Sequence, residues 1–202
     1  MQNGLTADEL LKLLTDGFAV ERDAADRWSL TVRVARDKLH ALIKFLRDDP
    51  RLAFDQLLDV AGIDYLSYPD WRGPRFAVSY PLKSTTFRHR VIVKVLVEED
   101  DAKVPSLNDL YRSANYAERE TWDQYGVVFT GHPNLKRLLN HHEFIGHPLR
   151  KDYPCQKRQK LSVNDPMLDQ LAERVTALGY QIIEGATVHP GAPMTVKNGA
   201  AS

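Results

Sequence analysis

The sequence of 202 residues contains a single cysteine, Cys155. One thiol can form no intramolecular disulfide, and it cannot supply the cysteine ligands of an iron–sulfur cluster or a cysteine-rich zinc site. The cysteine count therefore suits a reducing compartment. We expect the chain to hold no such cluster or zinc site of its own.

Long apolar runs are also missing. The most apolar stretch, Val91 to Val97, is interrupted by Lys94 and is far shorter than the roughly 20 residues that span a bilayer. The first ten residues, MQNGLTADEL, have neither the basic start nor the apolar centre of a signal peptide. The composition is that of an ordinary soluble protein, with no transmembrane helix or leader expected.

The chain has no excess of charge of either sign, because its 27 basic residues balance its 27 acidic residues. The charges are nevertheless unevenly distributed along the sequence. Residues 131–160 hold seven basic and two acidic residues, together with four of the seven histidines. Such a stretch can be a solvated face, or it can contact nucleic acid, anionic lipid or an acidic protein surface. Only Phe144 and Tyr153 interrupt it as aromatic residues, which disfavours nucleic acid.

Hydrophobic periodicity predicts both helices and strands. Strands are expected near residues 28–34 and 63–66, and residues 75–82 and 87–97 should pair as an antiparallel hairpin. A capping box at Thr6 begins one predicted helix, Asp37 caps a second, and Phe54 to Leu58 suggest a short helical turn. A further helical region starts at Pro105 and runs to Tyr125. This mixture favours an α+β fold with a mixed or antiparallel sheet and flanking helices.

The chain divides into three predicted regions. Residues 1–130 form a single compact domain, residues 131–163 an extended basic arm, and residues 164–202 a C-terminal helix with a flexible tail. Glycines and prolines interrupt the arm, although a brief helix is expected near residues 134–139. Pro166 suits the start of the last helix and Gly179 its end. Because the arm has few apolar residues, we expect it to lie across a partner.

The histidines raise the possibility of a metal site. His142 and His147 superficially match a zincin motif, but that motif needs a spacing of four residues on one helix, and Gly146 disfavours a helix here. His132, His141 and His147 can still converge from loops. The favoured alternative is that they bond backbone groups, hold turns or meet a partner.

Carboxylates also cluster on a predicted helix, at Glu118, Glu120 and Asp123, with Arg119 able to pair with Asp123 at a spacing of four. Acid–base catalysis needs carboxylates whose environments separate their pKa values, which periodicity does not reveal. The sequence has no nucleophile elbow, no phosphate-binding loop and no dinucleotide motif. A metal-dependent hydrolase using the histidines with Glu118 and Glu120 is therefore the less favoured hypothesis.

Three motifs resemble a known family. They are ERETWD at residues 118–123, FTGHPNLKRLL at 129–139 and GHPLRKDYP at 146–154. In order and spacing they are similar to the complex I 30 kDa subunit family, the C subunits of proton-translocating NADH:quinone oxidoreductases. The resemblance is specific over residues 104–154 and weaker over 16–103.

The resemblance implies a non-catalytic hydrophilic subunit in the peripheral arm of respiratory complex I, on the cytoplasmic side of the bacterial inner membrane. FMN and iron–sulfur clusters would belong to partner subunits, and this chain would hold no cofactor, metal or active site. Its expected partners are the large hydrogenase-like D subunit and the neighbouring B and I subunits. The alternative within the same architecture is the equivalent subunit of a membrane-bound hydrogenase or formate hydrogenlyase.

The family motifs also imply a set of residues for helix packing, turn formation and contact between subunits. In Arg150, for example, a planar fork is available for carboxylates on a partner. The set comprises Glu118, Arg119, Glu120, Asp123, Gly131, His132, Pro133, Gly146, His147, Pro148, Arg150, Lys151, Asp152 and Tyr153.

Overall fold

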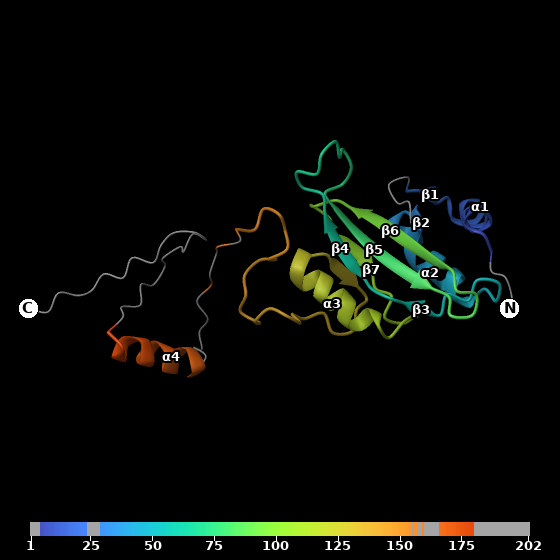
Figure 1. Cartoon of the computed structure of the whole chain (residues 1–202). Helices are drawn as coiled ribbons and strands as arrows, with labels where there is room; N and C mark the ends of the chain where they lie inside the picture. Colours follow the sequence, from blue (N-terminus) through green and yellow to red (C-terminus); the bar gives the residue numbers. More distant parts are fainter. Residues whose placement is uncertain (1–4, 24–28, 155, 157–158, 160–165, 180–202) are drawn as a thin grey trace, which may run out of the picture. The chain divides into compact units, whose positions relative to one another are not determined.

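The computed structural model describes residues 5–23, 29–154, 156, 159 and 166–179 (Figure 1). The chain separates into two compact units, Met1–Pro154 and Cys155–Ser202. In the second unit the structure describes helix α4 (Pro166–Ala177), which confirms the helix predicted to start at the proline. The first unit contains the remaining elements, and the α+β class is confirmed there.

A six-stranded mixed sheet is the centre of the first unit (Figure 1). Its strand order is β1-β2-β6-β5-β3, and β4 pairs with another part of β5. The predicted hairpin is confirmed as antiparallel, whereas β2 and β6 run parallel. The strands are β1 (Glu21–Arg22), β2 (Leu30–Arg33), β3 (Gln56–Leu57), β4 (Ala61–Asp64), β5 (Phe76–Lys83) and β6 (Arg90–Val97).

Alternation along β5 and β6 explains the core. Every second residue of β6 from Val91 is buried, as period-two side-chain alternation requires when one face of a sheet is covered. Helices α1 (Ala7–Phe18) and α2 (Leu39–Asp48) add leucines to the same core. The capping box of α1 is confirmed, because Thr6 Oγ1 accepts from the Glu9 N–H and the Thr6 N–H donates to the Glu9 carboxylate.

Two smaller predictions at the edges of this core are wrong. Asp37 does not cap α2, because it lies inside a 3₁₀ turn (Arg36–Lys38) that precedes the helix. The region from Phe54 contains strand β3 rather than a helical turn, and β3 pairs with the end of β5. A short apolar run can be buried in either conformation, so its periodicity does not distinguish the two.

The remaining elements lie beside β4. Helix α3 (Ala114–Tyr125) starts later than the predicted helical region, because Pro105 belongs to strand β7 (Lys103–Pro105). Strand β7 pairs in parallel with β8 (Val128–Thr130), which immediately follows α3. Figure 1 shows α3 next to β4, and the close Cα approaches between these two elements agree with that view.

Candidate functional site

Residues 131–154, which we call the docked segment, follow β8 and pass along α3 to the ends of β4 and β5 (Figure 1). The helix predicted near residues 134–139 is wrong, since this stretch is irregular, with a turn at Asn134 and bends at Leu138 and Leu139. The segment belongs to the same compact unit as the sheet. Polar contacts at several points hold it there, and they involve most of the motif residues.

The carboxylate of Asp123 makes the most extensive of these contacts. Its Oδ2 atom accepts the backbone N–H groups of Leu138, Leu139 and Asn140 at 3.1, 2.9 and 2.9 Å. Its Oδ1 atom accepts from Arg137 at 2.6 Å. Burial alone raises the pKa of Asp123, but the hydrogen bonds from Asn140 and Arg137 outweigh it and lower the pKa to about 2. The ionised Asp123 carboxylate therefore binds backbone N–H groups at the end of the predicted helix. In a helix these groups would instead donate to carbonyl oxygens one turn earlier.

Arg119 and His132 hold the start of the docked segment. Arg119 donates to the carbonyl oxygens of Lys136 and Arg137 at 3.1 and 3.0 Å, in place of the helix ion pair with Asp123 that its spacing allowed. His132 Nδ1 accepts from the Asn134 N–H, so its proton is assigned to Nε2, which donates to a carbonyl of α3 at 3.0 Å. Both side chains thus bond backbone groups.

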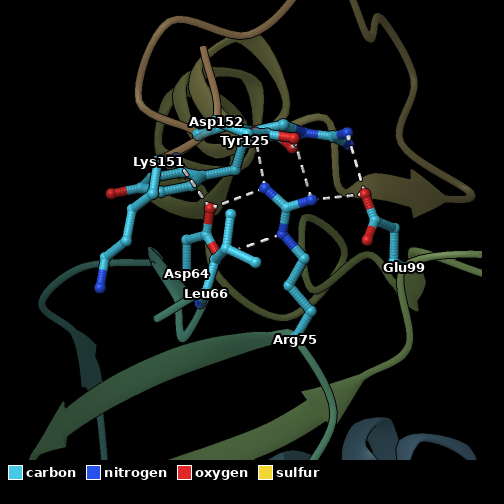
Figure 2. Close-up of polar contacts among 8 residues, drawn as sticks. Asp64, Leu66, Arg75, Glu99, Tyr125, Lys151 and Asp152 are labelled. Atoms are coloured by element: carbon cyan, nitrogen blue, oxygen red, sulfur yellow. Dashed lines mark hydrogen bonds and ion pairs between the residues drawn. The ribbon is translucent and has the colours of Figure 1, made fainter. Parts of the chain in front are cut away.

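Arg75, immediately before β5, holds the end of the docked segment (Figure 2). Its guanidinium lies between three carboxylates, donating to Asp64 at 3.1 Å, Asp152 at 2.6 Å and Glu99 at 2.6 Å. Asp64 also accepts the backbone N–H of Lys151 at 2.9 Å. Burial raises the pKa of Asp64, but the bonds from Arg75 and Lys151 produce a net lowering, so the carboxylate is ionised at neutral pH.

Arg150 and His147 pack on the end of α3. Arg150 Nε donates to the Tyr125 carbonyl at 2.6 Å, and its guanidinium carbon lies 5.0 Å from the Phe76 ring centroid. His147 Nδ1 donates to the Asp123 carbonyl at 3.0 Å, and burial lowers the pKa of this imidazole. The Arg150 guanidinium therefore meets the chain's own groups, with Nε on a backbone carbonyl and Nη1 4.0 Å from the Glu99 carboxylate. Gly126, with φ of 81°, is the close neighbour that makes room for both side chains.

Glu118 is fully buried on the other side of α3. Its carboxylate accepts from Ser106 Oγ and from the Leu107 N–H, both at 2.6 Å, and so joins α3 to the loop after β7. Burial raises the pKa of Glu118 to about 7 in spite of these two bonds. An elevated carboxyl pKa can indicate an acid–base catalyst, but here the group is enclosed by protein and has no exposed surface. Its position indicates a structural role.

The docked segment turns several apolar side chains outward. Leu139 is 63% exposed, Ile145 is 73% exposed and Leu149 is 53% exposed, whereas the Asp123 carboxylate beneath the segment is fully buried. On α3 the Tyr116 side chain is 64% exposed. A surface segment usually buries its apolar side chains and exposes its charged ones, and here that arrangement is inverted. We call Leu139, Ile145 and Leu149 the outward apolar residues.

Of the remaining motif residues, some are half-buried and the others are exposed to solvent. Gly146, Pro148 and Tyr153 are half-buried, and a Cβ atom at Gly146 would lie 2.8 Å from the Tyr153 ring. The exposed members of the motif set are Glu120, Gly131, Pro133, Lys151 and Asp152.

The histidines do not converge within the described part of the chain. His132 and His147 each bond a carbonyl of α3, and the rings of His141 and His142 lie 4.1 Å apart by centroids. Among the residues described, no group of three or more His, Cys, Asp or Glu side chains is placed to hold a metal ion. In the same residues, no helix is long and apolar enough to cross a membrane.

Several residues that complete these contacts were not predicted from the sequence. Asp64, Arg75 and Ser106 lie 87, 77 and 12 residues from their partners Lys151, Asp152 and Glu118. No local pattern joins positions so far apart. The basic character of the arm was visible, but it did not show that Arg137 would turn inward.

Comparison with known proteins identifies a single family. The model of the family described as "Respiratory-chain NADH dehydrogenase, 30 Kd subunit" matches residues 32–159. The C subunit of NADH-quinone oxidoreductase from Acidithiobacillus ferrooxidans is 47% identical over 131 residues, covering 64% of this chain and 65% of the relative. The protein of the same name from a Roseiflexus species is 44% identical over 154 residues, covering 76% and 85%. The chain thus matches just under two thirds of the length of the first relative.

Solved structures agree with these sequence matches. The trypsin-resistant fragment (1-134) of Nqo5 is 36% identical, with a TM-score of 0.54, over 62% of this chain and 96% of the fragment. A chain of an archaeal membrane-bound sulfane sulfur reductase is 22% identical, with a TM-score of 0.59, over 90% and 98% of the two chains. At that identity the second likeness shows the fold alone.

Proposed function

The chain belongs to the family of the respiratory-chain NADH dehydrogenase 30 kDa subunit, and on that premise we propose that it is a non-catalytic subunit of a proton-translocating NADH:quinone oxidoreductase. In that role it holds together the hydrophilic arm of the complex near the quinone-reducing end. Electrons pass from NADH through FMN and iron–sulfur clusters of other subunits, and the chain itself takes part in no transfer step.

The inverted polarity of the docked segment is the observation that carries this proposal. Its charged and polar groups bond the chain's own α3 and sheet, through Asp123, Arg137 and Arg75. Its outward apolar residues are left exposed, although solvent contact of such side chains is unfavourable by roughly 25 cal/mol per Å². A segment that is bonded to its own domain with its apolar side chains outward is suited to bury those side chains against another protein.

The family membership suggests which proteins these are. We propose the large hydrogenase-like D subunit as the main partner, with the B and I subunits as neighbours, on the cytoplasmic side of the bacterial inner membrane. The chain would reach the membrane only through these partners. Nothing in the proposal requires a cofactor in this chain, and the buried position of Glu118 gives that carboxyl no access to a substrate.

Affinity purification from detergent-solubilised membranes tests the proposal. The tagged chain is expected to bring down the D, B and I subunits with FMN and iron–sulfur clusters in stoichiometric amounts. Leu139→Asp combined with Ile145→Asp should reduce this recovery strongly, because the two carboxylates would be desolvated at the interface. Leu58→Asp, at a comparably exposed leucine after β3, is the matched control and should leave recovery unchanged.

Two results would contradict the proposal. One is recovery of hydrogenase subunits in place of the NADH-oxidising ones, which would favour the hydrogenase-type complex. The other is a purified chain without partners that contains stoichiometric metal and hydrolyses a substrate.

A further inference from the structure

A groove of about 320 Å³ opens beside the last part of the docked segment. Its lining includes Tyr65, Tyr68, Tyr125, Leu149 and Lys151. Tyr68 is 56% exposed and Leu149 is 53% exposed, so the opening is lined by apolar and aromatic surface in contact with solvent. Leu149 is one of the outward apolar residues, whereas the tyrosines and Lys151 have no part in the contacts of the proposed function.

The aromatic wall of the groove is preformed. The rings of Tyr65 and Trp71 stack with centroids 4.1 Å apart, and Tyr68 meets Tyr65 edge-on at 5.6 Å. Trp71 Nε1 donates to the Pro74 carbonyl at 2.9 Å, which closes the loop that carries all three rings. A rigid aromatic surface loses little conformational entropy on binding, which favours its use as a recognition site.

The floor of the groove is equally constrained. A Cβ atom at Gly62 in β4 would lie 2.5 Å from the Tyr125 ring, so the glycine allows that ring to lie directly on the strand. Tyr125 is in turn held by Arg150, which donates to its carbonyl. Gly62 and Tyr125 therefore set the depth of the groove, and a side chain that enters must be short or flat.

The charge at the groove comes from Lys151. Asp64 also borders the groove, but its carboxylate is engaged by Arg75 and by two backbone N–H groups (Figure 2). Among the described residues Lys151 is in no ion pair, and its ammonium lies 6.0 Å from the Tyr68 ring centroid. The backbone N–H of Lys151 bonds the Asp64 carboxylate, which remains ionised but already accepts two bonds from Arg75, and the exposed ammonium is left to meet another carboxylate.

We propose that this groove receives a segment of a partner protein in which an apolar or aromatic side chain neighbours a carboxylate. The apolar side chain enters between Tyr68 and Leu149, and the carboxylate pairs with Lys151. One available cation is too few for a polyanion, whose binding depends on many phosphate contacts. Tyrosine is instead among the residues enriched at the energetically dominant contacts between proteins. The inference rests on the proposed function, because it assigns a contact within the same assembly.

Site-specific photo-crosslinking in the intact complex tests the occupant. A benzophenone amino acid replaces Tyr68 in one variant and Leu139 in another, and cross-linked peptides are identified after irradiation of solubilised membranes. At position 68 we expect a peptide from a partner protein with an apolar residue next to Asp or Glu. A lipid adduct, a peptide without an acidic residue, or no adduct at position 68 would overturn the inference.

Rebinding measurements supply the second test. The full-length chain is titrated onto complex that lacks it, and the half-saturating concentration is measured at low and moderate salt. Tyr68→Ala is expected to raise this concentration about 30-fold, the effect of losing one dominant contact. Lys151→Glu should raise it most at low salt, whereas Lys151→Arg should not. Lys12→Glu on α1 is the matched charge reversal and should have no effect.

The two sets of variants separate this inference from the proposed function. One outcome is that Leu139→Asp loses the partner subunits, and the benzophenone at position 139 cross-links to them, while the Tyr68 and Lys151 variants bind normally. In that case the groove receives no partner segment and the scaffold role stands. If the unsubstituted chain recovers none of the NADH-oxidising subunits, the proposed function itself fails.

Discussion

The Asp123 carboxylate and the Arg137 guanidinium lie 2.6 Å apart and join helix α3 to the docked segment. The aspartate is fully buried and the arginine side chain is 15% exposed, so the pair is largely removed from solvent. Three backbone N–H groups complete the carboxylate's bonds. One side chain of α3 therefore determines the path of residues 137–140.

Replacing Asp123 by Asn should release this part of the segment. The amide cannot accept from all the donors that meet there, and Arg137 is left without its counter-charge. We expect the free energy of unfolding to fall by about 3–5 kcal/mol, the range for breaking one side of a buried ion pair. Urea unfolding of the full chain measures this, and limited proteolysis should show new cleavage near Arg137. Glu120→Gln, on the exposed side of the same helix, should change stability by no more than about 0.5 kcal/mol.

Glu118 should make stability fall as pH rises. Its pKa in the folded chain is about 7, above the ordinary value of 4.5, so folding favours the protonated form. The associated stabilisation is complete below about pH 4.5 and is lost as pH rises through 7, an effect of about 3 kcal/mol. Glu118→Gln should remove this decline, and the difference between the two unfolding profiles isolates it from other groups. Parallel profiles would show that the pKa of Glu118 is the same in the folded and the unfolded chain.

Alanine substitutions at Gly126 and Gly131 separate the stability cost of a steric clash from the cost of backbone strain. Both have positive φ, 81° and 85°. A Cβ atom at Gly126 would lie 2.6 Å from both Arg150 and His147, whereas at Gly131 nothing lies within 4 Å. Gly131→Ala should therefore cost about 1 kcal/mol, and Gly126→Ala clearly more, because it also displaces two side chains of the docked segment. Equal losses in thermal or urea unfolding would contradict the close contact.

Arg75 should matter far more to stability than the exposed carboxylate it binds. Arg75→Ala leaves Asp64, whose side chain is 2% exposed, without its counter-charge, and should lower the free energy of unfolding by about 3–5 kcal/mol. Asp152 is 52% exposed at its side chain, and Asp152→Ala should cost at most about 1 kcal/mol. Chemical unfolding at neutral pH compares the two. A larger loss for Asp152→Ala would mean that the end of the docked segment, rather than Asp64, depends on Arg75.

Regular periodicity and local capping were predictable from the sequence because they depend on neighbouring residues. The β5–β6 hairpin follows from alternating valines, and the start of α1 from the Thr6 and Glu9 pair. The family was recognisable from motif order and spacing alone. The failures occurred where a local pattern was short, as at β3, or where a distant carboxylate took the backbone N–H groups, as at residues 138–140.

The sequence by itself determined the α+β class, the main elements of the sheet, the family and the set of motif residues. Only the tertiary structure decided which side chains of the docked segment face inward. Arg137 and Arg150 looked like part of a basic surface, yet each bonds the chain's own α3. The physical reason is that burying a charge is favourable only when its partner is positioned to meet it. That condition depends on residues such as Asp64 and Asp123, which the fold brings to the segment.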